Sequence, residues 1–597
     1  MSVTTKYSIG TFFASVIGSC LGMVMTFVLI ISTLVWLAFN VLENYSESEP
    51  NVSENGQVLL LNFNKPIVEK ADYNPLEELD LPFNMGASQL GINQIREGLL
   101  KAANDKNIKG VFLRIENPSA GYAKLNEIKH LIDDFKLSSG KQVVAYGESM
   151  SEKAYYLACS ANKIYITPVG SLDFKGLSTE LLFFKGLFEK LDIEPRIFRV
   201  GKFKSAVEPF MLSKMSDENR MQVQQFLEEI LSENLKAEGE SRNIRQATLR
   251  TLSDGLVIRD LILAEQHGLI DGAKYYDEVM TDLYTELSIK MDEELLSFSA
   301  YIEKSLDAVS ISTSPKIAVV VAEGEITSGG SKRNESIGSS SFNSTLQKAV
   351  EDSSIKAIVL RINSPGGSAL ASDVMWREIK LASKIKPVVC SMSDVAASGG
   401  YYMAMACDYI YAYPNTITGS IGVFGLSVEL EGFLNKKLGI TTDKVVTGKY
   451  SDLGSPLHQL KEEEFSIIQE GVERIYEDFT KKAAESRKMS HQDLKEIASG
   501  RVWSGVKAKE IGLVDELGDL DDAILKAATL ASIEIYDILY FPKNKNIYEQ
   551  ITGDIETKLE SNVFNSFEAG NQLKKSLEYI QSLDKVQARM PYDLLID

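Results

Sequence analysis

A serine set among small residues is the first candidate for chemistry in this chain of 597 residues. Ser398 lies in the stretch VAASGGYYMAMACDYIYAYPNTITGSIGVFG, which runs from Val395 to Gly425. Small residues let a helix pack closely against a sheet, and this is one reason for such a composition. A serine at the first turn of a helix, beside glycines that leave backbone amides uncovered, is also how a nucleophile is presented. Ser398 is therefore our candidate nucleophile.

A serine hydroxyl attacks a carbonyl group only when a neighbouring base takes its proton, and that base is usually a histidine or an amine. The four histidines lie outside the serine and glycine motifs, which argues against a Ser-His-Asp site: His130, His267, His458 and His491. A lysine can replace histidine when burial keeps its amine uncharged, against an ordinary pKa of about 10.4. Lys204, in the segment GKFKSAVEPF, has apolar neighbours and is our candidate base.

Backbone N–H groups would complete such a site by stabilising the oxyanion that forms during acyl transfer. The segment NSPGGS follows a predicted strand, so the amide of Gly366 or Gly367 is a candidate donor, joined by that of Gly399 beside the serine. A proline followed by two glycines also makes an ordinary tight turn. Ser420, in TGSIG, either hydrogen-bonds the lysine amine and positions it or simply caps a helix or turn.

The chain repeats itself at a nearly constant offset. IKGVFLRIENPSAG begins at Ile108 and IKAIVLRINSPGGS at Ile355, an offset of 247 residues. YYLACSANKIYITP and YYMAMACDYIYAYP, GKFKS and GKYSD, and AEQHGLID and AKEIGLVD form further pairs at offsets of 246, 247 and 244. An offset this constant indicates a tandem duplication.

Each half alternates β-branched runs with amphipathic stretches, for example KAIVLRINSP and SDVMWREIKLASKI. Alternating strands and helices predict α/β repeats, each with a mainly parallel sheet covered by helices. We expect an anchor over residues 1–45, repeats over 55–305 and 315–540, and a helical tail over 541–597.

The two halves differ where chemistry would be done. Ser398 falls opposite Glu152, and Lys204 falls opposite Ser451. The first half therefore keeps the lysine and lacks the serine, while the second keeps the serine and lacks the lysine. This reciprocal pattern predicts one composite site made by both halves, within one chain or between subunits.

Composition excludes several classes of function. Lys and Arg number 63 and Asp and Glu number 83, for a net charge of −20, which argues against nucleic acid as a partner. Four cysteines lie in apolar runs without the spacing of metal ligands: Cys20, Cys159, Cys390 and Cys407. We expect no metal site and no cofactor, and a disulfide framework is not indicated.

The N-terminal region predicts a membrane anchor. No charge interrupts the chain from Tyr7 to Leu42, which is longer than the roughly 20 residues that span a bilayer. A cleaved signal peptide would have a shorter apolar core, so we expect a retained single span that contacts lipid through residues 9–39. Lys6 precedes the span and acidic residues follow it, which predicts a cytoplasmic N-terminus and extracytoplasmic catalytic domains.

Five motifs together resemble the signal peptide peptidase A (protease IV) family in its long, duplicated, membrane-anchored form: RINSPGGS, AASGGYY, TGSIGVFG, GKFKSAVEPF and GLVDELG. The resemblance implies a Clp protease/crotonase-like fold of ββα repeats and a homo-tetramer in the bacterial inner membrane. It assigns the nucleophile to Ser398 and the general base to Lys204. Many members of this family have glycine where this chain has Ser393, which leaves the local backbone geometry open.

These features predict a membrane-bound serine endopeptidase with a Ser/Lys dyad that degrades cleaved signal peptides and other hydrophobic peptides. A crotonase-like enzyme acting on acyl-CoA would use the same sheet and oxyanion glycines, although coenzyme A is scarce outside the cytoplasm. A non-catalytic membrane scaffold is the third possibility, suggested by the degenerate first half.

Overall fold

The computed structural model describes residues 56–71, 89–291, 293–306, 314–331, 335–543 and 586–590, with the single residues 22, 25, 26 and 29. The predicted anchor over residues 1–45, with its lipid-contacting segment 9–39, therefore lies almost entirely outside the described residues. Among the helices that are described, none combines the length and apolar character needed to cross a bilayer.

The first repeat is built on a six-stranded parallel sheet in the order β8-β6-β5-β4-β1-β9. Its strands are β1 (Gln57–Asn62), β4 (Ile108–Arg114), β5 (Gln142–Gly147), β6 (Lys163–Ile166), β8 (Gly272–Ala273) and β9 (Leu296–Ser297). The central strand β4 is buried along most of its length. Strands covered on both faces read as apolar runs, which explains why these segments lack the alternation of a half-exposed sheet.

Helices complete the first repeat, with a short two-stranded sheet of β2 (Ile67–Val68) and β3 (Leu90–Gly91). The helices are α2 (Ile92–Asn104), α3 (Tyr122–Ser139), α4 (Glu152–Ala158), α5 (Lys185–Leu191), α6 (Glu208–Met211), α7 (Asp217–Arg242), α8 (Gln246–Asp254), α9 (Leu261–Gln266), α10 (Tyr276–Leu287) and α11 (Phe298–Leu306). Local sequence sets their ends. Ser216 caps α7 by accepting a hydrogen bond from Asn219 N, and Gly140 ends α3 in the left-handed conformation.

The second repeat is built the same way. Its parallel strands are β10 (Lys316–Glu323), β13 (Ile355–Ser364), β15 (Val388–Ala397), β16 (Tyr409–Ala412), β20 (Glu516–Leu517) and β21 (Asp537–Phe541), extended by β17 (Ile417–Gly419) and β19 (Val502–Ser504). The pairing β21-β10-β13-β15-β16-β20 matches β9-β1-β4-β5-β6-β8 strand for strand. The predicted duplication of a mainly parallel α/β unit is confirmed.

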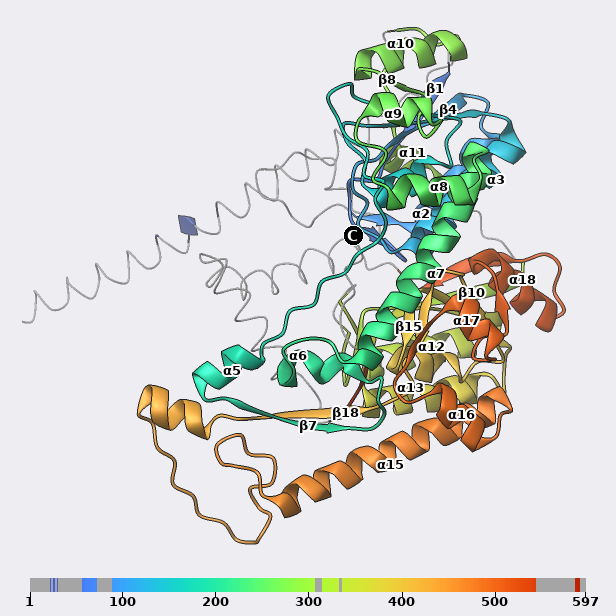
Figure 1. Ribbon diagram of the computed structural model, residues 1–597. Helices are drawn as coiled ribbons and strands as arrows, with labels where there is room; N and C mark the ends of the chain where they lie inside the picture. Colours follow the sequence, from blue (N-terminus) through green and yellow to red (C-terminus); the bar gives the residue numbers. More distant parts are fainter. Residues whose placement is uncertain are drawn as a thin grey trace, which may run out of the picture. The chain divides into compact units, whose positions relative to one another are not determined.

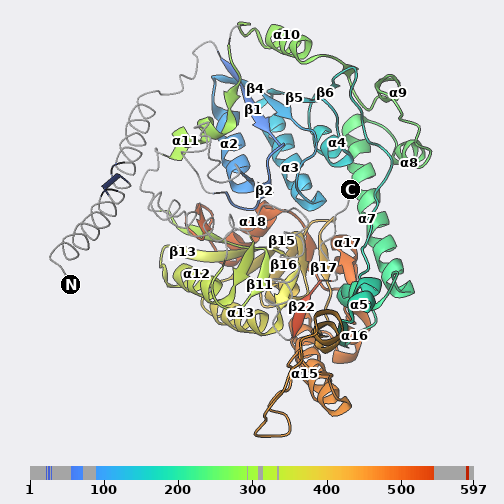
Figure 2. The same cartoon turned by 90° about the vertical axis from the view of Figure 1, so that its left-hand side faces the viewer.

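The helices of the second repeat cover both faces of its sheet. They are α12 (Ser339–Glu351), α13 (Ala369–Ala382), α14 (Gly399–Ala404), α15 (Glu462–Arg487), α16 (His491–Ile497), α17 (Gly505–Glu510) and α18 (Leu520–Leu530). One face packs on α12 to α14 and the other on α18. In Figure 2, α2, α3 and α18 lie between the strands of the first sheet and those of the second, and α3 contacts β15.

A third sheet joins segments from both halves in the order β12-β11-β14-β22-β18-β7. Its strands are β7 (Glu194–Arg199), β11 (Glu325–Thr327), β12 (Ser336–Gly338), β14 (Gly366–Ser368), β18 (Phe424–Glu429) and β22 (Gln587–Arg589). In the region predicted to be a helical tail, the described residues 586–590 thus include a strand, while most of the predicted helix lies outside the described residues.

The two repeats belong to one compact unit. The chain divides by its internal contacts into Met1–Gly56 and Gln57–Asp597. Within the second unit, the long helix α7 contacts α4 and α8 of the first repeat and β19 of the second. Figure 1 shows α7 extending from beside α8 towards the elements of the second repeat. Strand β7 of the first repeat pairs with β18 of the second over Glu194–Arg199. The segment between β7 and α7 carries Lys204 into the second repeat.

Candidate active site

The structure brings the predicted nucleophile and base together within one chain. The Nζ atom of Lys204 lies 2.8 Å from the Oγ atom of Ser398, although 194 positions separate the residues. Both side chains are fully buried, with 0% of their surface exposed. A hydroxyl group and an amine at this distance have the geometry that proton transfer needs.

Ser398 sits at a sharp turn from strand to helix. Strand β15 ends at Ala397 and helix α14 begins at Gly399, so the serine alone makes the turn. Its φ of 53° and ψ of −108° lie in a region of backbone conformation that residues other than glycine rarely adopt. Holding a serine in this conformation costs about 1–3 kcal/mol. Hydrogen bonds hold it there: Ser398 N donates to Gly419 O at 2.8 Å, and Tyr402 N donates to Ser398 O at 2.8 Å.

Lys204 enters through a slot between two glycines that the sequence analysis did not single out. A Cβ atom added at Gly500 would lie 2.7 Å from the Cβ of Lys204, and one added at Gly422 would lie 3.4 Å from its Cδ. Gly500 also has a φ of +79°. Gly422 belongs to the TGSIGVFG motif, which was the available signal for it, whereas Gly500 lies in the segment SGRVW, outside the motifs.

Burial lowers the pKa of the Lys204 amine well below its usual range, because an ammonium ion would lose its hydration there. The partners of Nζ in the described part of the chain are uncharged oxygens. Besides Ser398, they are the carbonyl and hydroxyl oxygens of Ser420, each at 3.1 Å. The residues that follow Lys204 are apolar and buried: Ala206 and Val207 pack against Phe424.

Ser420 contacts the lysine directly. Its own backbone is held by a hydrogen bond from Ser420 N to Arg501 O at 2.7 Å, and it has a φ of 48°. Of the two interpretations that the sequence leaves open, a contact with the amine is the one the geometry matches.

The three predicted glycines lie beside the serine. Gly366 and Gly367 have φ values of +99° and +152°, and a Cβ atom added at Gly366 would lie 2.7 Å from Gly399 N. The amide of Gly366 donates to Ser364 Oγ at 3.2 Å. Backbone from the two motifs NSPGGS and AASGG therefore meets at the predicted nucleophile.

The equivalent positions of the other copies have different partners. Glu152, which replaces the serine in the first repeat, begins α4 and accepts hydrogen bonds from Lys175 N and Gly176 N at 2.8 and 2.7 Å. Ser451, which replaces the lysine in the second repeat, is exposed in a loop, where its hydroxyl donates to Gly448 O at 3.0 Å. Of the two possible combinations, Lys204 with Ser398 is the one that forms.

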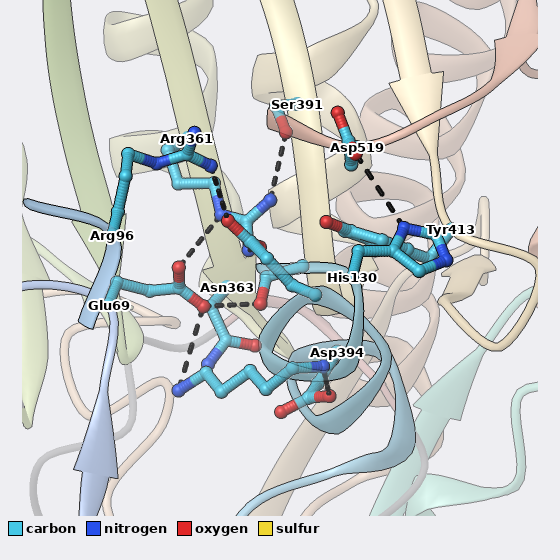
Figure 3. A network of polar contacts seen from close by, with 12 residues as sticks. Glu69, Arg96, His130, Arg361, Asn363, Ser391, Asp394, Tyr413 and Asp519 are labelled. Carbon is cyan, nitrogen blue, oxygen red and sulfur yellow. Dashed lines mark hydrogen bonds and ion pairs between the residues drawn. The ribbon is translucent and has the colours of Figure 1, made fainter. Parts of the chain in front are cut away.

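A buried network of charges, which the sequence patterns did not indicate, ties the first repeat to the strand that carries Ser398 (Figure 3). Arg361 on β13 pairs with Glu69 at 2.8 Å and with Glu127 on α3, and each side chain is 1% exposed. Burial opposes the charge of Arg361, but the carboxylates of Glu127 and Glu69 outweigh it and hold the pKa of the guanidinium well above its usual range. The only sequence signal was an arginine inside a β-branched run.

The network reaches β15 at three residues. Ser391 accepts from Arg361 Nη1 at 2.9 Å (Figure 3). Ser393 donates to Glu69, and Asp394 accepts from Gly121 N and Lys124 N at 3.0 and 2.9 Å. Ser393 is the residue that stands where many members of the resembled family have glycine. In this chain its hydroxyl group bonds β15 to the first repeat.

Comparisons with known proteins point to one family of peptidases. The model of peptidase family S49 matches residues 136–290 and 380–534. The chloroplastic serine protease SPPA of Arabidopsis thaliana is 36% identical over 467 residues, which cover 77% of this chain and 68% of that protein. Protease 4 of Haemophilus influenzae is 36% identical, covering 72% of each chain. Protease 4 of Salmonella typhi is 33% identical, covering 90% of this chain and 88% of that one.

The fold and the similarities define a serine-type peptidase. The chain belongs to peptidase family S49, with one copy of the family's domain in each repeat. The resemblance seen in its motifs is confirmed. Neither the acyl-CoA enzyme nor the non-catalytic scaffold is supported by these similarities.

Proposed function

We propose that this peptidase uses Ser398 as its nucleophile and Lys204 as its general base, and that it degrades cleaved signal peptides and other hydrophobic peptides. The observation that carries the proposal is the distance of 2.8 Å between Lys204 Nζ and Ser398 Oγ in a fully buried setting. The lowered pKa of the amine supports it, because only an uncharged amine can accept the proton of the hydroxyl group.

The chemical steps follow from these two groups. The hydroxyl of Ser398 donates to the neutral amine of Lys204 and adds to the carbonyl carbon of the peptide bond. Lys204 then returns the proton to the leaving amine, and water hydrolyses the ester with Lys204 again as base. The scheme uses no metal and no cofactor.

The remaining residues have supporting roles in this proposal. Ser420 positions the lysine, since both of its oxygens lie 3.1 Å from Nζ. The amides of Gly399 and of Gly366 or Gly367 stabilise the oxyanion. The engagement of Gly366 N with Ser364 favours Gly367 and Gly399 as donors in the state described.

The setting of the enzyme completes the proposal. The motif resemblance supports the signal-peptide substrate, a homo-tetramer, and a Clp protease/crotonase-like ββα fold in repeats 55–305 and 315–540. The charge-free run from Tyr7 to Leu42 supports a single span through residues 9–39 of the bacterial inner membrane, with the N-terminus in the cytoplasm.

Two substitutions test the dyad. Ser398→Ala and Lys204→Ala are each expected to lower kcat for a hydrophobic peptide by about 10²–10⁴-fold or more while the oligomer stays intact. Lys202→Ala is the matched control, because Lys202 is an exposed lysine two positions away. Full activity of either dyad variant, measured by peptide hydrolysis and size-exclusion chromatography, would contradict the assignment.

A further inference from the structure

A histidine and two carboxylates converge where the loop of residues 439–461 meets the start of helix α15. In Figure 1 this loop leads into the first turn of the helix. His458 Nε2 lies 3.6 Å from Asp452 Oδ2 and 4.0 Å from Glu464 Oε2. One ligand atom from each of the three side chains lies within 4.8 Å of the other two. The proposed mechanism uses none of these residues.

The cluster contains buried polar atoms that lack partners. The side chain of Glu464 is 1% exposed, and those of Asp452 and His458 are mostly buried. Glu464 Oε2 accepts a hydrogen bond from Lys461 N at 2.9 Å. Among the described residues, however, nothing hydrogen-bonds to Glu464 Oε1 or to His458 Nε2. Buried polar atoms normally have partners, and separations of 3.6 and 4.0 Å are too long for hydrogen bonds within the cluster.

The first repeat shows how the equivalent position is satisfied by protein groups alone. Helices α7 and α15 each contain 26 residues, and Asn219 and Glu464 each stand third in their helix. Asn219 Nδ2 donates to the buried carboxylate of Glu208 at 2.9 Å. In the second repeat a carboxylate replaces this amide donor, and it faces a second carboxylate, that of Asp452. A cation between the two would supply the positive charge that this arrangement needs.

Two lysines offset part of the negative charge from outside the cluster. Lys444 forms an ion pair with Asp452, and Lys461 Nζ lies 4.0 Å from Glu464 Oε1. Both lysine side chains are more than half exposed, so their ammonium groups can turn into water at little cost. Lys444 therefore competes with an ion for Asp452 without closing the site.

We propose that Asp452, His458 and Glu464 form a binding site for a divalent transition-metal ion of the zinc type. Imidazole nitrogen and carboxylate oxygen bind Zn²⁺ at about 2.0–2.2 Å, which places tetrahedral ligand atoms about 3.3 Å apart. Rotation of the two side chains that lie on the loop closes the difference from the observed separations. The imidazole favours Zn²⁺ over Mg²⁺ and Ca²⁺, which prefer oxygen ligands alone.

The ion would have a structural role. It would tie the loop to the first turn of α15, at a point that the same loop already joins to the third sheet. Leu460 N donates to Glu429 Oε1 at 2.8 Å, and Glu429 on β18 pairs with Arg196 on β7 at 2.7 Å. The expectation of no metal site came from the spacing of the cysteines, and no cysteine belongs to this cluster. The inference goes beyond the proposed function and does not rest on it.

Zinc binding by the full chain tests the site. The chain is purified in detergent without a polyhistidine tag, stripped of metal with EDTA and titrated with ZnCl₂ by calorimetry. Wild type should bind one Zn²⁺ per chain, and His458→Gln and Glu464→Gln should each weaken binding by about 100-fold or more. Glutamine at position 464 can still cap α15. His491→Gln is the matched control, because His491 Nε2 lies 3.9 Å from the single carboxylate of Glu477, and it should bind Zn²⁺ like wild type.

Two further measurements separate a built site from binding at scattered surface groups. Lys444→Met should bind Zn²⁺ more tightly than wild type, because the competing ammonium group is gone. The Tm of wild type should rise with ZnCl₂ concentration, whereas that of His458→Gln should not. No Zn²⁺ binding by wild type, or equal affinities and equal Tm increases for wild type and His458→Gln, would overturn the proposal. Ser398→Ala should lose peptide hydrolysis and keep the affinity for Zn²⁺, so the dyad and the metal site are tested independently.

Discussion

In the proposed mechanism, the chemistry of this peptidase depends on one buried amine. Lys204 has no carboxylate among its described partners, so burial alone lowers its pKa. The unfolded chain holds lysine at an ordinary pKa of about 10.4. Between the lowered folded pKa and that value, the unfolded state binds one more proton than the folded state. Activity and stability are therefore both linked to the same titration.

The first prediction concerns this linkage. We expect kcat/KM to rise with pH through the folded pKa of Lys204 and then to level off, since the neutral amine is the active form. Stability should also rise with pH across the same window, up to about pH 10.4, because protonation favours the unfolded state below it. Lys204→Met should therefore have the higher Tm at neutral pH, and the difference should shrink as the pH rises. A Tm difference that is constant from pH 6 to about pH 10 would contradict this.

A second prediction concerns the slot that holds the lysine. Gly500→Ala should lower kcat by about 10²-fold, because the new Cβ would lie 2.7 Å from the Lys204 Cβ and displace the amine. Gly439→Ala is the matched control. Gly439 has a similar φ of +68°, but a Cβ added there meets nothing within 4 Å. Equal kcat values for the two variants in peptide hydrolysis would show that the contact of residue 500 with Lys204 does not matter for catalysis.

At the scale of elements, the network around Arg361 sets where β15 lies. This strand delivers Ser398 at its end, and its residues Ser391 and Ser393 bond to Arg361 and Glu69. Helix α3 of the first repeat bonds to the same strand through Asp394. The second repeat thus depends on the first for the position of its nucleophile.

The third prediction follows from that network. Arg361→Met should destabilise the protein by about 3–5 kcal/mol, because it leaves the buried carboxylates of Glu69 and Glu127 without their shared partner. Chemical denaturation measures the change, with Arg377→Met as the control at an exposed arginine on α13. If both variants unfold at the same denaturant concentration, the network does not hold the repeats in the way described.

At the scale of the whole molecule, the two residues of the proposed dyad come from different copies of the duplicated unit. The first repeat contributes Lys204 through the segment after β7, and the second contributes Ser398 after β15. Pairing of β7 with β18 brings the two segments together inside one chain. Each chain therefore contains both residues of the proposed dyad.

The fourth prediction tests that arrangement. Ser398→Ala and Lys204→Ala chains, co-expressed so that mixed oligomers form, should show no more peptide hydrolysis than either variant alone. The distance of 2.8 Å within one chain requires both residues on the same polypeptide. Co-expression of each variant with wild type is the control for assembly. Recovery of activity in the mixed variants would show that the lysine is supplied by a neighbouring subunit.

Sequence patterns were sufficient to predict a large part of the fold and of the candidate site. The β-branched runs predict the strands of both sheets, because a strand covered on both faces must be apolar along its length. Comparison of the two copies selects Lys204 among many lysines, since one copy keeps it and the other has Ser451. By contrast, Gly500, Glu69 and Glu127 have no local pattern that marks them. Their roles come from contacts with residues far away in the chain.

The sequence by itself determined the duplication, the α/β architecture and the residue types at the site, because hydrophobic period and motif spacing are written along the chain. Only the tertiary structure decided that Lys204 and Ser398 meet within one chain and that the amine is fully enclosed. It also decided that Gln587–Arg589 is a strand in the third sheet, in a region where local pattern predicts a helix. The physical reason is that burial and strand pairing depend on partners hundreds of positions away, which no local pattern specifies.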